Sequence, residues 1–382
     1  METLELIPQM TFAIASKNNF RYVKHAVKYI RENCYRKDHM IHIGIDGEDI
    51  ELETYYKDDN SIVVTKSVSG IAAIYNDIAK KTTTDFILIY HADMIAGKDM
   101  DLYLYKQWKQ GTIVSATRIE PPLHPADPAK IVDNFGLWPE EDVTDGFKKV
   151  DFNRFVENNL DNDKITKGVF APWLISKDDY WVVNGHDEDL NSHSEDRDLF
   201  NRFLLNGFDF VQPWNAMVYH LTCRGGQFQH AISTENLKTK SESWNALAAE
   251  NTKKFIRKWG TQPMYDEFQY PIVAPKYNIG LIIYNATTDL VIFLEPYFTT
   301  IYTNNLGRVE GVSKLKDIND ELTNDIFVTV NAEKLTNENI GFLLQLPYIL
   351  KQSGQIGNMK HDIFNLHIKS LTEYQNDLIK VN

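Results

Sequence analysis

The chain has 382 residues, of which 43% are hydrophobic, so it can form two or three domains with buried cores. Its formal net charge of −13 argues against a nucleic-acid partner, because nucleic acid is bound through basic surfaces. The two cysteines, Cys34 and Cys223, exclude a disulfide scaffold and a cysteine-rich zinc site. With no apolar signal sequence in the first nine residues and no apolar run of membrane-spanning length, we expect a cytoplasmic protein without a transmembrane segment.

The first two-thirds of the sequence alternates short apolar runs with helical periodicity. This alternation predicts an α/β domain with a mainly parallel sheet flanked by helices. The proline-rich stretch 118–146 interrupts it and is predicted to be a long loop, with order resuming over 168–176. We predict strands over 11–15, 40–45, 61–65, 85–90, 112–116, 208–211 and 216–221, and helices over about 20–30, 71–80, 196–206 and 237–259.

A domain border is predicted near residue 262, where three prolines follow one another at positions 263, 271 and 275. Residues 1–262 are predicted to form the larger domain. Residues 263–382 are predicted to form a smaller α/β domain that binds an acceptor or joins two copies of the chain. Its expected strands are 279–284, 290–294 and 298–302, followed by a β-α-β unit over 326–330, 340–352 and 363–368.

Polar residues follow the strands of the larger domain, at the edge where open α/β sheets bind ligands. Asp93 and His220 are the best candidates for metal ligands, because Mn²⁺ accepts both carboxylate oxygen and imidazole. Such an ion would bridge the phosphates of a nucleotide and offset the charge of a leaving group. His91 is an outer-sphere group, a third ligand or a histidine whose hydrogen bonds are satisfied at a strand end. Asp93 alone is equally typical of a turn after a strand, and a lone histidine such as His220 is more often structural than a ligand.

A second group of carboxylates precedes the helix predicted at 196–206. Glu195 and Asp196 would begin that helix, and a helix N-terminus favours negative charge. Both side chains are therefore expected to stay ionised, and one is suited to take a proton from a hydroxyl group. The same residues also fit a plain helix cap with Ser194 at the N-cap position.

Together these residues resemble the family 2 glycosyltransferases with the GT-A fold, a Rossmann-like nucleotide-binding fold. The resemblance extends from residue 11 to about residue 226. His91 stands where the family has the first aspartate of its DxD motif, and His186 stands where it has the second glycine of its acceptor segment. The matching segments are 11–18, 43–47, Gly70 with Asn76, 91–94, 184–188, Glu195 with Asp196, and 219–220.

The resemblance implies an enzyme of glycan biosynthesis that transfers a hexose from a UDP- or GDP-sugar to a glycan or other hydroxyl acceptor, with inversion. Asp196 would be the base, with Glu195 beside it, and Mn²⁺ or Mg²⁺ would bind Asp93, His220 and His91. The donor would contact Ala15, Ser16, Asn18, Asp46, Gly70, Asn76 and His91, and the acceptor would contact His186, Asp187 and Glu188.

Three further side chains are candidates on weaker patterns. Arg224 lies in the predicted loop 222–226, which would close over the donor, although a solvated loop charge has the same pattern. Trp173 and Trp181 flank the acceptor segment and would stack on a sugar ring, although core packing is the commoner role of tryptophan.

Two other classes of function stay open at this point. One is a non-catalytic protein that binds a sugar or nucleotide sugar on a degenerate transferase fold, which His91 in the metal motif favours. The other is a nucleotidyltransferase, which would need a glycine-rich phosphate loop that the segment 15–20 lacks.

Overall fold

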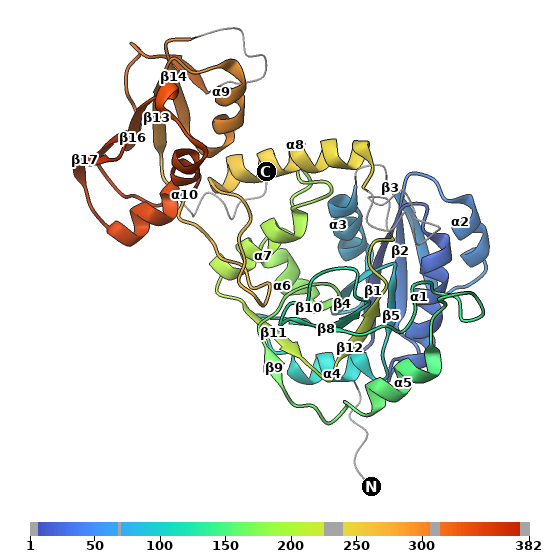
Figure 1. Ribbon diagram of the computed structural model, residues 1–382. Helices are drawn as coiled ribbons and strands as arrows, with labels where there is room; N and C mark the ends of the chain where they lie inside the picture. The colour runs from blue at the N-terminus through green and yellow to red at the C-terminus, as the bar shows by residue number, and fades with distance from the viewer. Residues whose placement is uncertain (1–6, 68–69, 225–239, 306–313, 375–382) are drawn as a thin grey trace. The chain divides into compact units, whose positions relative to one another are not determined.

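The computed structural model describes residues 7–67, 70–224, 240–305 and 314–374 (Figure 1). These residues form two compact units, one of residues 7–248 with 265–271 and the other of residues 249–264 with 272–374. The division falls inside helix α8 (Glu242–Trp259), ahead of the border predicted at 262. The start of the predicted helix, 237–239, lies outside the described residues.

The first unit is built on an eight-stranded sheet among the residues that are described. Strands β1, β2, β3 and β4 run parallel to one another, and β6 runs parallel to β11. Strands β10 and β9 are antiparallel to their neighbours. The order across the sheet is β3 (Ile62–Ser67), β2 (Met40–Asp46), β1 (Met10–Ser16), β4 (Phe86–His91), β10 (Trp173–Ser176), β6 (Thr112–Ser115), β11 (Asp209–Pro213) and β9 (Ile165–Thr166).

The strand register brings the carboxyl ends of β1, β2 and β4 to one edge of this sheet. Ala15 lies opposite Gly44 on one side and opposite His91 on the other. Trp173 pairs with Ile89, so the start of the antiparallel strand β10 reaches the same edge. Polar residues that are far apart in the sequence therefore meet there.

A second, four-stranded sheet completes this edge. Its order is β5 (Met94–Ala96), β12 (Met217–His220), β7 (Thr117–Glu120) and β8 (Lys130–Val132). The prediction of a long loop over 118–146 is wrong in this part, since it contains β8 and nearly all of β7. These strands carry Arg118, Glu120 and Lys130, whose charges hide the apolar pattern by which buried strands are recognised.

Helices cover both faces of the large sheet (Figure 1). The connections from β1 to β2 and from β3 to β4 run in opposite directions along the sheet, so right-handed crossovers place α1 and α3 on opposite faces. Gly44 lets α3 pack closely, because a Cβ atom there would lie 2.3 Å from Ile74 Cγ2. The helices of this unit are α1 (Phe20–Asn33), α2 (Ile50–Tyr56), α3 (Ile71–Lys81), α4 (Met100–Gln107), α5 (Lys149–Glu157), α6 (Lys177–Val182) and α7 (Glu195–Leu205).

The second unit contains a six-stranded sheet with its own core. Its order is β15 (Leu315–Asp317), β14 (Thr300–Thr303), β13 (Ile279–Tyr284), β16 (Ile326–Asn331), β18 (Phe364–Ile368) and β17 (Gly357–His361). Strand β18 is antiparallel to β16, so the β-α-β unit predicted over 326–368 is not a parallel one. The helices are α9 (Thr288–Leu294) and α10 (Asn337–Ser353), with short 3₁₀ helices η3 (Glu295–Tyr297) and η4 (Ala332–Lys334).

The strand predicted at 290–294 is wrong, because this segment belongs to helix α9. Thr287 caps the helix by accepting a hydrogen bond from the backbone nitrogen of Leu290 at 3.3 Å. Val291 and Leu294 are buried three residues apart, as on one face of a helix, whereas Phe293 is exposed. A five-residue apolar run does not distinguish the two structures.

The predicted class, an α/β chain with mainly parallel sheets flanked by helices, is confirmed. No helix in the part of the chain that the structure describes is long and apolar enough to cross a membrane.

Candidate active site

Three potential metal ligands converge where the two sheets of the first unit meet. His91 is the last residue of β4, Asp93 follows in the turn to β5, and His220 is the last residue of β12. Pairing of His220 with Met94 across β12 and β5 brings His220 next to that turn. One ligand atom from each of the three side chains lies within 4.8 Å of the others.

Glu120, which the sequence analysis missed, contacts the ring nitrogen of His220 that does not face Asp93. Its Oε1 atom lies 2.7 Å from His220 Nδ1, while His220 Nε2 lies 3.5 Å from Asp93 Oδ1. Arg118 and Lys130 contact the Glu120 carboxylate at 2.8 and 2.9 Å, and only 2% of Glu120 is exposed. A carboxylate that accepts the Nδ1 proton of a histidine leaves Nε2 free to bind a metal ion.

Opposite charges set the protonation of this cluster. Burial works to lower the pKa of His220, but the negative charges of Asp93 and Glu120 raise it to about 9. Burial opposes ionisation of Asp93 and Glu120, yet the His220 cation lowers the pKa of both carboxyl groups. Burial lowers the pKa of His91. Without a metal, the proton on His220 supplies the positive charge between the two carboxylates.

The donor set fits a divalent cation. It offers one carboxylate and two imidazoles, and a bound cation would take the place of the His220 Nε2 proton between Asp93 and Glu120. Phe170 covers the cluster from one side, with its ring centroid 5.6 Å from that of His91 and 5.8 Å from that of His220. Oxygen and nitrogen ligands of this kind suit Mn²⁺.

The carboxylate pair Glu195 and Asp196 begins helix α7. The residues before it, His193 and Ser194, both have left-handed backbone angles, with φ of 74° and 70°. Ser194 makes no side-chain capping hydrogen bond, so the plain helix cap considered for this segment is not formed. Consecutive left-handed residues without glycine are costly and are found mainly at functional sites.

Glu195 and Asp196 differ in protonation, which corrects the expectation that both are ionised. Burial and the neighbouring charge of Asp196 raise the pKa of Glu195 to about 8. Burial also opposes ionisation of Asp196, but the contact with His186, whose Nε2 lies 3.5 Å from Asp196 Oδ1, and the charge of His186 outweigh it and lower the pKa of Asp196. At neutral pH Asp196 is therefore the carboxylate able to accept a proton.

The metal ligands and the carboxylate pair lie at one site. The charge of Asp196 acts to raise the pKa of His91, and the charges of Asp93, Glu195 and Asp196 all act to raise the pKa of Tyr75. Segments from β4, β12 and α7 thus contribute to one group of interacting charges.

The predicted donor residues lie at the adjoining strand ends. Ser16 is buried, and its hydroxyl has no hydrogen-bond partner among the described residues. Asp46 pairs with the exposed Lys17 at 2.9 Å. Gly70 has a φ of 85° and approaches the backbone of Asn191, where a Cβ atom would lie 2.5 Å from the carbonyl oxygen. Ala15 and Asn18 complete the set beside β1, with Asn18 exposed.

Three predicted contacts need correction. Trp173 is fully buried in the core, so its ring has no face for a sugar. The Asn76 side chain is bound on both sides by residues 180–188, so it positions that segment and is not open to a donor. Arg224 is fully buried as well, with its guanidinium on the Leu137 carbonyl and over the Trp138 ring, so it is neither a solvated loop charge nor a lid residue in this state.

The predicted acceptor segment divides into buried and exposed residues. Glu188 is exposed and accepts a hydrogen bond from Asn76 Nδ2 at 2.9 Å. Asp187 is nearly buried, and Trp181 is half-buried with its ring packed on Tyr180. Glu188 and Trp181 can therefore reach an acceptor, whereas His186 is enclosed beneath Asp196.

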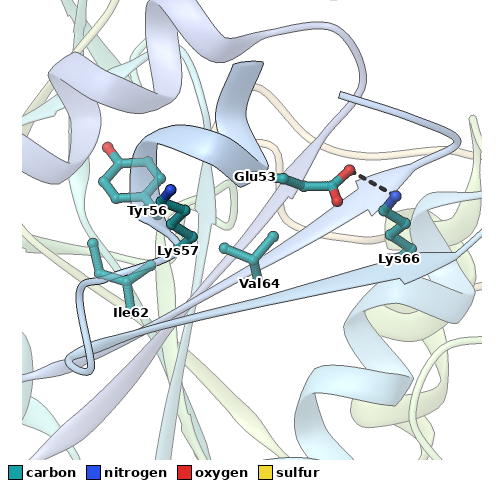
Figure 2. A pocket seen from close by; sticks show the side chains of 6 residues that line it. All are labelled: Glu53, Tyr56, Lys57, Ile62, Val64 and Lys66. Atoms are coloured by element: carbon teal, nitrogen blue, oxygen red, sulfur yellow. Dashed lines mark ion pairs between the residues drawn. The ribbon is translucent and has the colours of Figure 1, made fainter. Parts of the chain in front are cut away.

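A separate cavity lies away from these residues, between α2 and β3 (Figure 2). Its volume is about 310 Å³, and Glu53 forms an ion pair with Lys66 across it at 2.8 Å. The remaining lining residues are Tyr56, Lys57, Ile62 and Val64. Neither the potential metal ligands nor the carboxylates line it, so we do not assign it to the active site.

Solved structures of similar fold include two complexes with Mn²⁺. GalNAc-T7 with UDP, GalNAc and Mn²⁺ aligns at 13% identity and a TM-score of 0.42, over 56% of this chain and 44% of that chain. The mannosyltransferase PcManGT from Pyrobaculum calidifontis, in complex with GDP-Man and Mn²⁺, aligns at 12% identity and a TM-score of 0.42, over 66% of this chain and 65% of that chain. TarS from S. aureus aligns at 12% identity and a TM-score of 0.39, over 65% of this chain and 43% of that chain.

The chain thus spans less than half the length of the first of these structures. No protein-family model and no curated protein sequence matches the chain. At these identities and TM-scores, function is inferred from the residues of the site alone.

Proposed function

We propose that the chain is a metal-dependent glycosyltransferase that moves a sugar from a UDP- or GDP-sugar to an acceptor hydroxyl, with inversion at the anomeric carbon. The observation that supports it is the pairing of two chemistries at one sheet edge. A His91–Asp93–His220 cluster suits a cation on a diphosphate, and the ionised Asp196 interacts electrostatically with it.

In the proposed step, the acceptor oxygen forms a bond to the anomeric carbon while its proton moves to the Asp196 carboxylate. The bond between the anomeric carbon and the diphosphate oxygen breaks, and its electron pair leaves with the nucleotide diphosphate. Glu195, protonated at neutral pH, is suited to donate a hydrogen bond to the sugar or the acceptor. Attack on the face opposite the diphosphate gives inversion.

A Mn²⁺ or Mg²⁺ ion, held by Asp93, His220 and His91, would supply positive charge to the departing diphosphate. Ser16 and Asp46 lie where the nucleotide would sit, and the unpartnered hydroxyl of Ser16 is a ready hydrogen-bonding group. Trp181 and Glu188 lie on the acceptor side. Glu120 would keep His220 oriented with Nε2 toward the cation.

A non-catalytic protein that binds nucleotide sugars is the alternative, favoured by His91 in place of a metal-binding carboxylate. Such a protein has no need of an ionised carboxylate at the site. The half-buried Asp196, with its lowered pKa, favours the enzyme.

The test is a screen of UDP- and GDP-linked hexoses, with Mn²⁺, against mono- and oligosaccharide acceptors. Nucleotide release and the anomeric proton signals of the product would be followed by NMR. The proposal predicts release that stops with EDTA and a product of inverted configuration. A retained configuration would contradict inversion, and tight binding of a donor without turnover of any acceptor would support the binding protein.

A further inference from the structure

His186 occupies a buried position that the mechanism above leaves unused. It follows Gly185, whose φ is 66° and where a Cβ atom would lie 2.4 Å from Asn76 Oδ1. Glycine at position 185 therefore allows the chain to turn inward here. The imidazole of His186 is fully buried, with its ring centroid 5.3 Å from that of Tyr75 and 6.4 Å from that of Trp173.

The hydrogen bonds of Asn76 can be assigned without ambiguity. Its Oδ1 atom lies 2.9 Å from the backbone nitrogen of His186, which can only donate, so this atom is the amide oxygen. Its Nδ2 atom donates to the His186 carbonyl and to Glu188, each at 2.9 Å. The orientation of the Asn76 amide is thereby fixed.

This orientation determines the proton of Tyr180. The Tyr180 hydroxyl lies 2.7 Å from Asn76 Oδ1, and because that oxygen carries no proton, the hydroxyl must donate to it. The hydroxyl has one proton, so its oxygen can only accept from His186 Nδ1, which lies 2.6 Å away. His186 therefore carries a proton on Nδ1.

The second ring nitrogen of His186 faces the proposed base. Nε2 lies 3.5 Å from Asp196 Oδ1, and it has no hydrogen-bond partner among the residues described. With Nδ1 protonated, Nε2 is the position where this imidazole gains or loses a proton. One proton between Nε2 and the Asp196 carboxylate satisfies both groups, whereas two bare lone pairs would repel each other.

We propose that His186 is a positioning residue that works through Asp196, and that the proton on its Nε2 keeps the Asp196 carboxylate ionised and oriented for the acceptor. The acceptor O–H bond breaks and its proton binds Asp196, while the Nε2 proton stays on His186 and faces Asp196 Oδ1. Asn76 and Tyr180 hold the Nδ1 proton in place throughout, so Nε2 is always the nitrogen that faces Asp196. This inference rests on the proposed function for its reaction step, but the state of His186 can be measured without transfer.

Several other charged or titratable groups face the pair of His186 and Asp196 and would shift its titration. They come from every element packed around it and are unchanged in the variants below. They are Tyr75 on α3, Glu188 beside Tyr180, Glu195 and Arg197 on α7, and His91 at the end of β4.

The first experiment reads the tautomer directly. Metal-free protein labelled with ¹⁵N-histidine would be titrated by NMR, with His186→Gln to assign the signals. The expected result is a proton on Nδ1 and a bare Nε2 at high pH, with protonation of Nε2 as the pH falls. In Tyr180→Phe, which lacks the hydroxyl, the two tautomers should mix. A proton on Nε2 at high pH in the wild type would overturn the proposal.

The second experiment compares pH profiles of kcat in the wild type and His186→Gln. Glutamine can still contact Asp196, but it carries no positive charge. We expect kcat to fall roughly tenfold or more with KM for the donor unchanged. The acid limb should also move to higher pH, because the charge of His186 lowers the pKa of Asp196 in the wild type and the variant lacks that charge.

A purely structural role for His186 predicts no shift of the acid limb. An acid limb that stays in place or moves to lower pH would overturn the proposal, as would an unchanged kcat. His42→Gln is the matched control, since His42 is a buried histidine on β2 bonded to Thr65, and its profile should match the wild type. If His186→Gln fails to fold, Tyr180→Phe tests the same contact, with a lowered kcat expected.

Discussion

Different kinds of residue stand at the strand ends of the two units. In the first unit, β4, β7 and β12 end in His91, Glu120 and His220, and their charges are buried or half-buried. In the second unit, exposed asparagines follow β13 and β14 and bond to each other's segments, with Asn285 nitrogen donating to Asn304 Oδ1 at 3.0 Å. Among the described residues, the group of three potential metal ligands lies in the first unit.

The comparison shows that a parallel sheet alone does not make an active site. Burying Glu120 with Arg118 and Lys130 removes three charges from water, which costs free energy that a set of apolar side chains would not. The second unit needs no such charges at its strand ends to fold. The buried charges of the first unit are therefore best explained by the chemistry they support.

The largest expected effect comes from removing the base of the first unit. Asp196→Asn keeps the size of the side chain but cannot accept the acceptor proton, so kcat should fall by roughly 10²–10⁴-fold. Donor binding should be unchanged. Asp178→Asn, which changes an exposed carboxylate at the start of α6, is the control for a general loss of charge. Equal losses of kcat in Asp196→Asn and Asp178→Asn would show that Asp196 does not act as the base.

Glu120→Gln should affect both metal binding and stability. Without the carboxylate, His220 loses its fixed orientation, and Mn²⁺ affinity should fall roughly 10–100-fold. Arg118 and Lys130 would be left without their buried partner, which should cost about 3–5 kcal/mol of unfolding free energy. Mn²⁺ titration and urea denaturation measure the two effects.

Glu53→Gln gives the matched comparison, because its ion pair with Lys66 lies at the cavity wall in Figure 2 and is open to solvent. Its loss should cost less than about 1 kcal/mol and leave Mn²⁺ binding unchanged. Similar costs for the two variants would mean that Glu120 is no more than a surface partner.

The stability of the metal-free protein should depend on pH through the protonation of His220. Its pKa is raised to about 9 in the folded metal-free protein, so the native state binds a proton more tightly than the unfolded chain. This stabilisation is complete below the unfolded value of about 6.5 and is lost as the pH rises to about 9. The loss should be on the order of 1–3 kcal/mol.

Urea denaturation at pH 6 and pH 9, with EDTA, measures that loss, and His220→Asn should abolish most of the difference. A metal-free wild type that is equally stable at both pH values would contradict the placement of His220 between two carboxylates. The ends of β13 and β14 in the second unit should show no comparable dependence, since they are followed by the neutral asparagines Asn285 and Asn304.

The smallest effect is expected at the strand ends of the second unit. Asn304→Ala removes an exposed hydrogen bond to Asn285 and should cost about 1 kcal/mol or less. Nucleotide and Mn²⁺ affinities should not change. A loss of nucleotide binding in this variant would assign the second unit a part in the donor site.

Much of the site could be predicted because apolar strands end in polar residues. The runs before Asp46 and His91 define β2 and β4, and the order of the segments places Asp93 and His220 at one edge. Glu120 could not be found in this way, because its strand reads Thr117-Arg118-Ile119-Glu120 within a proline-rich stretch. Its burial depends on ion pairs with residues that only the fold brings together.

The burial of individual side chains could not be predicted from the sequence either. Trp173 and Trp181 have the same residue type and flank the same segment, yet the first begins the buried strand β10 and the second lies on the last turn of α6. Asn76 matches a motif, but its partners lie 110 residues away in the chain at His186. Such contacts follow from tertiary packing and leave no local pattern.

The most direct test of the central claim is calorimetric titration of UDP and GDP into the protein, with and without Mn²⁺. The variants are Asp93→Ala and, as control, Asp133→Ala, which changes an exposed carboxylate just after β8. We expect one nucleotide to bind only with Mn²⁺, Asp93→Ala to abolish binding, and Asp133→Ala to retain it. Binding that is independent of Mn²⁺ and unaffected by Asp93→Ala would contradict a metal-dependent donor site at this sheet edge.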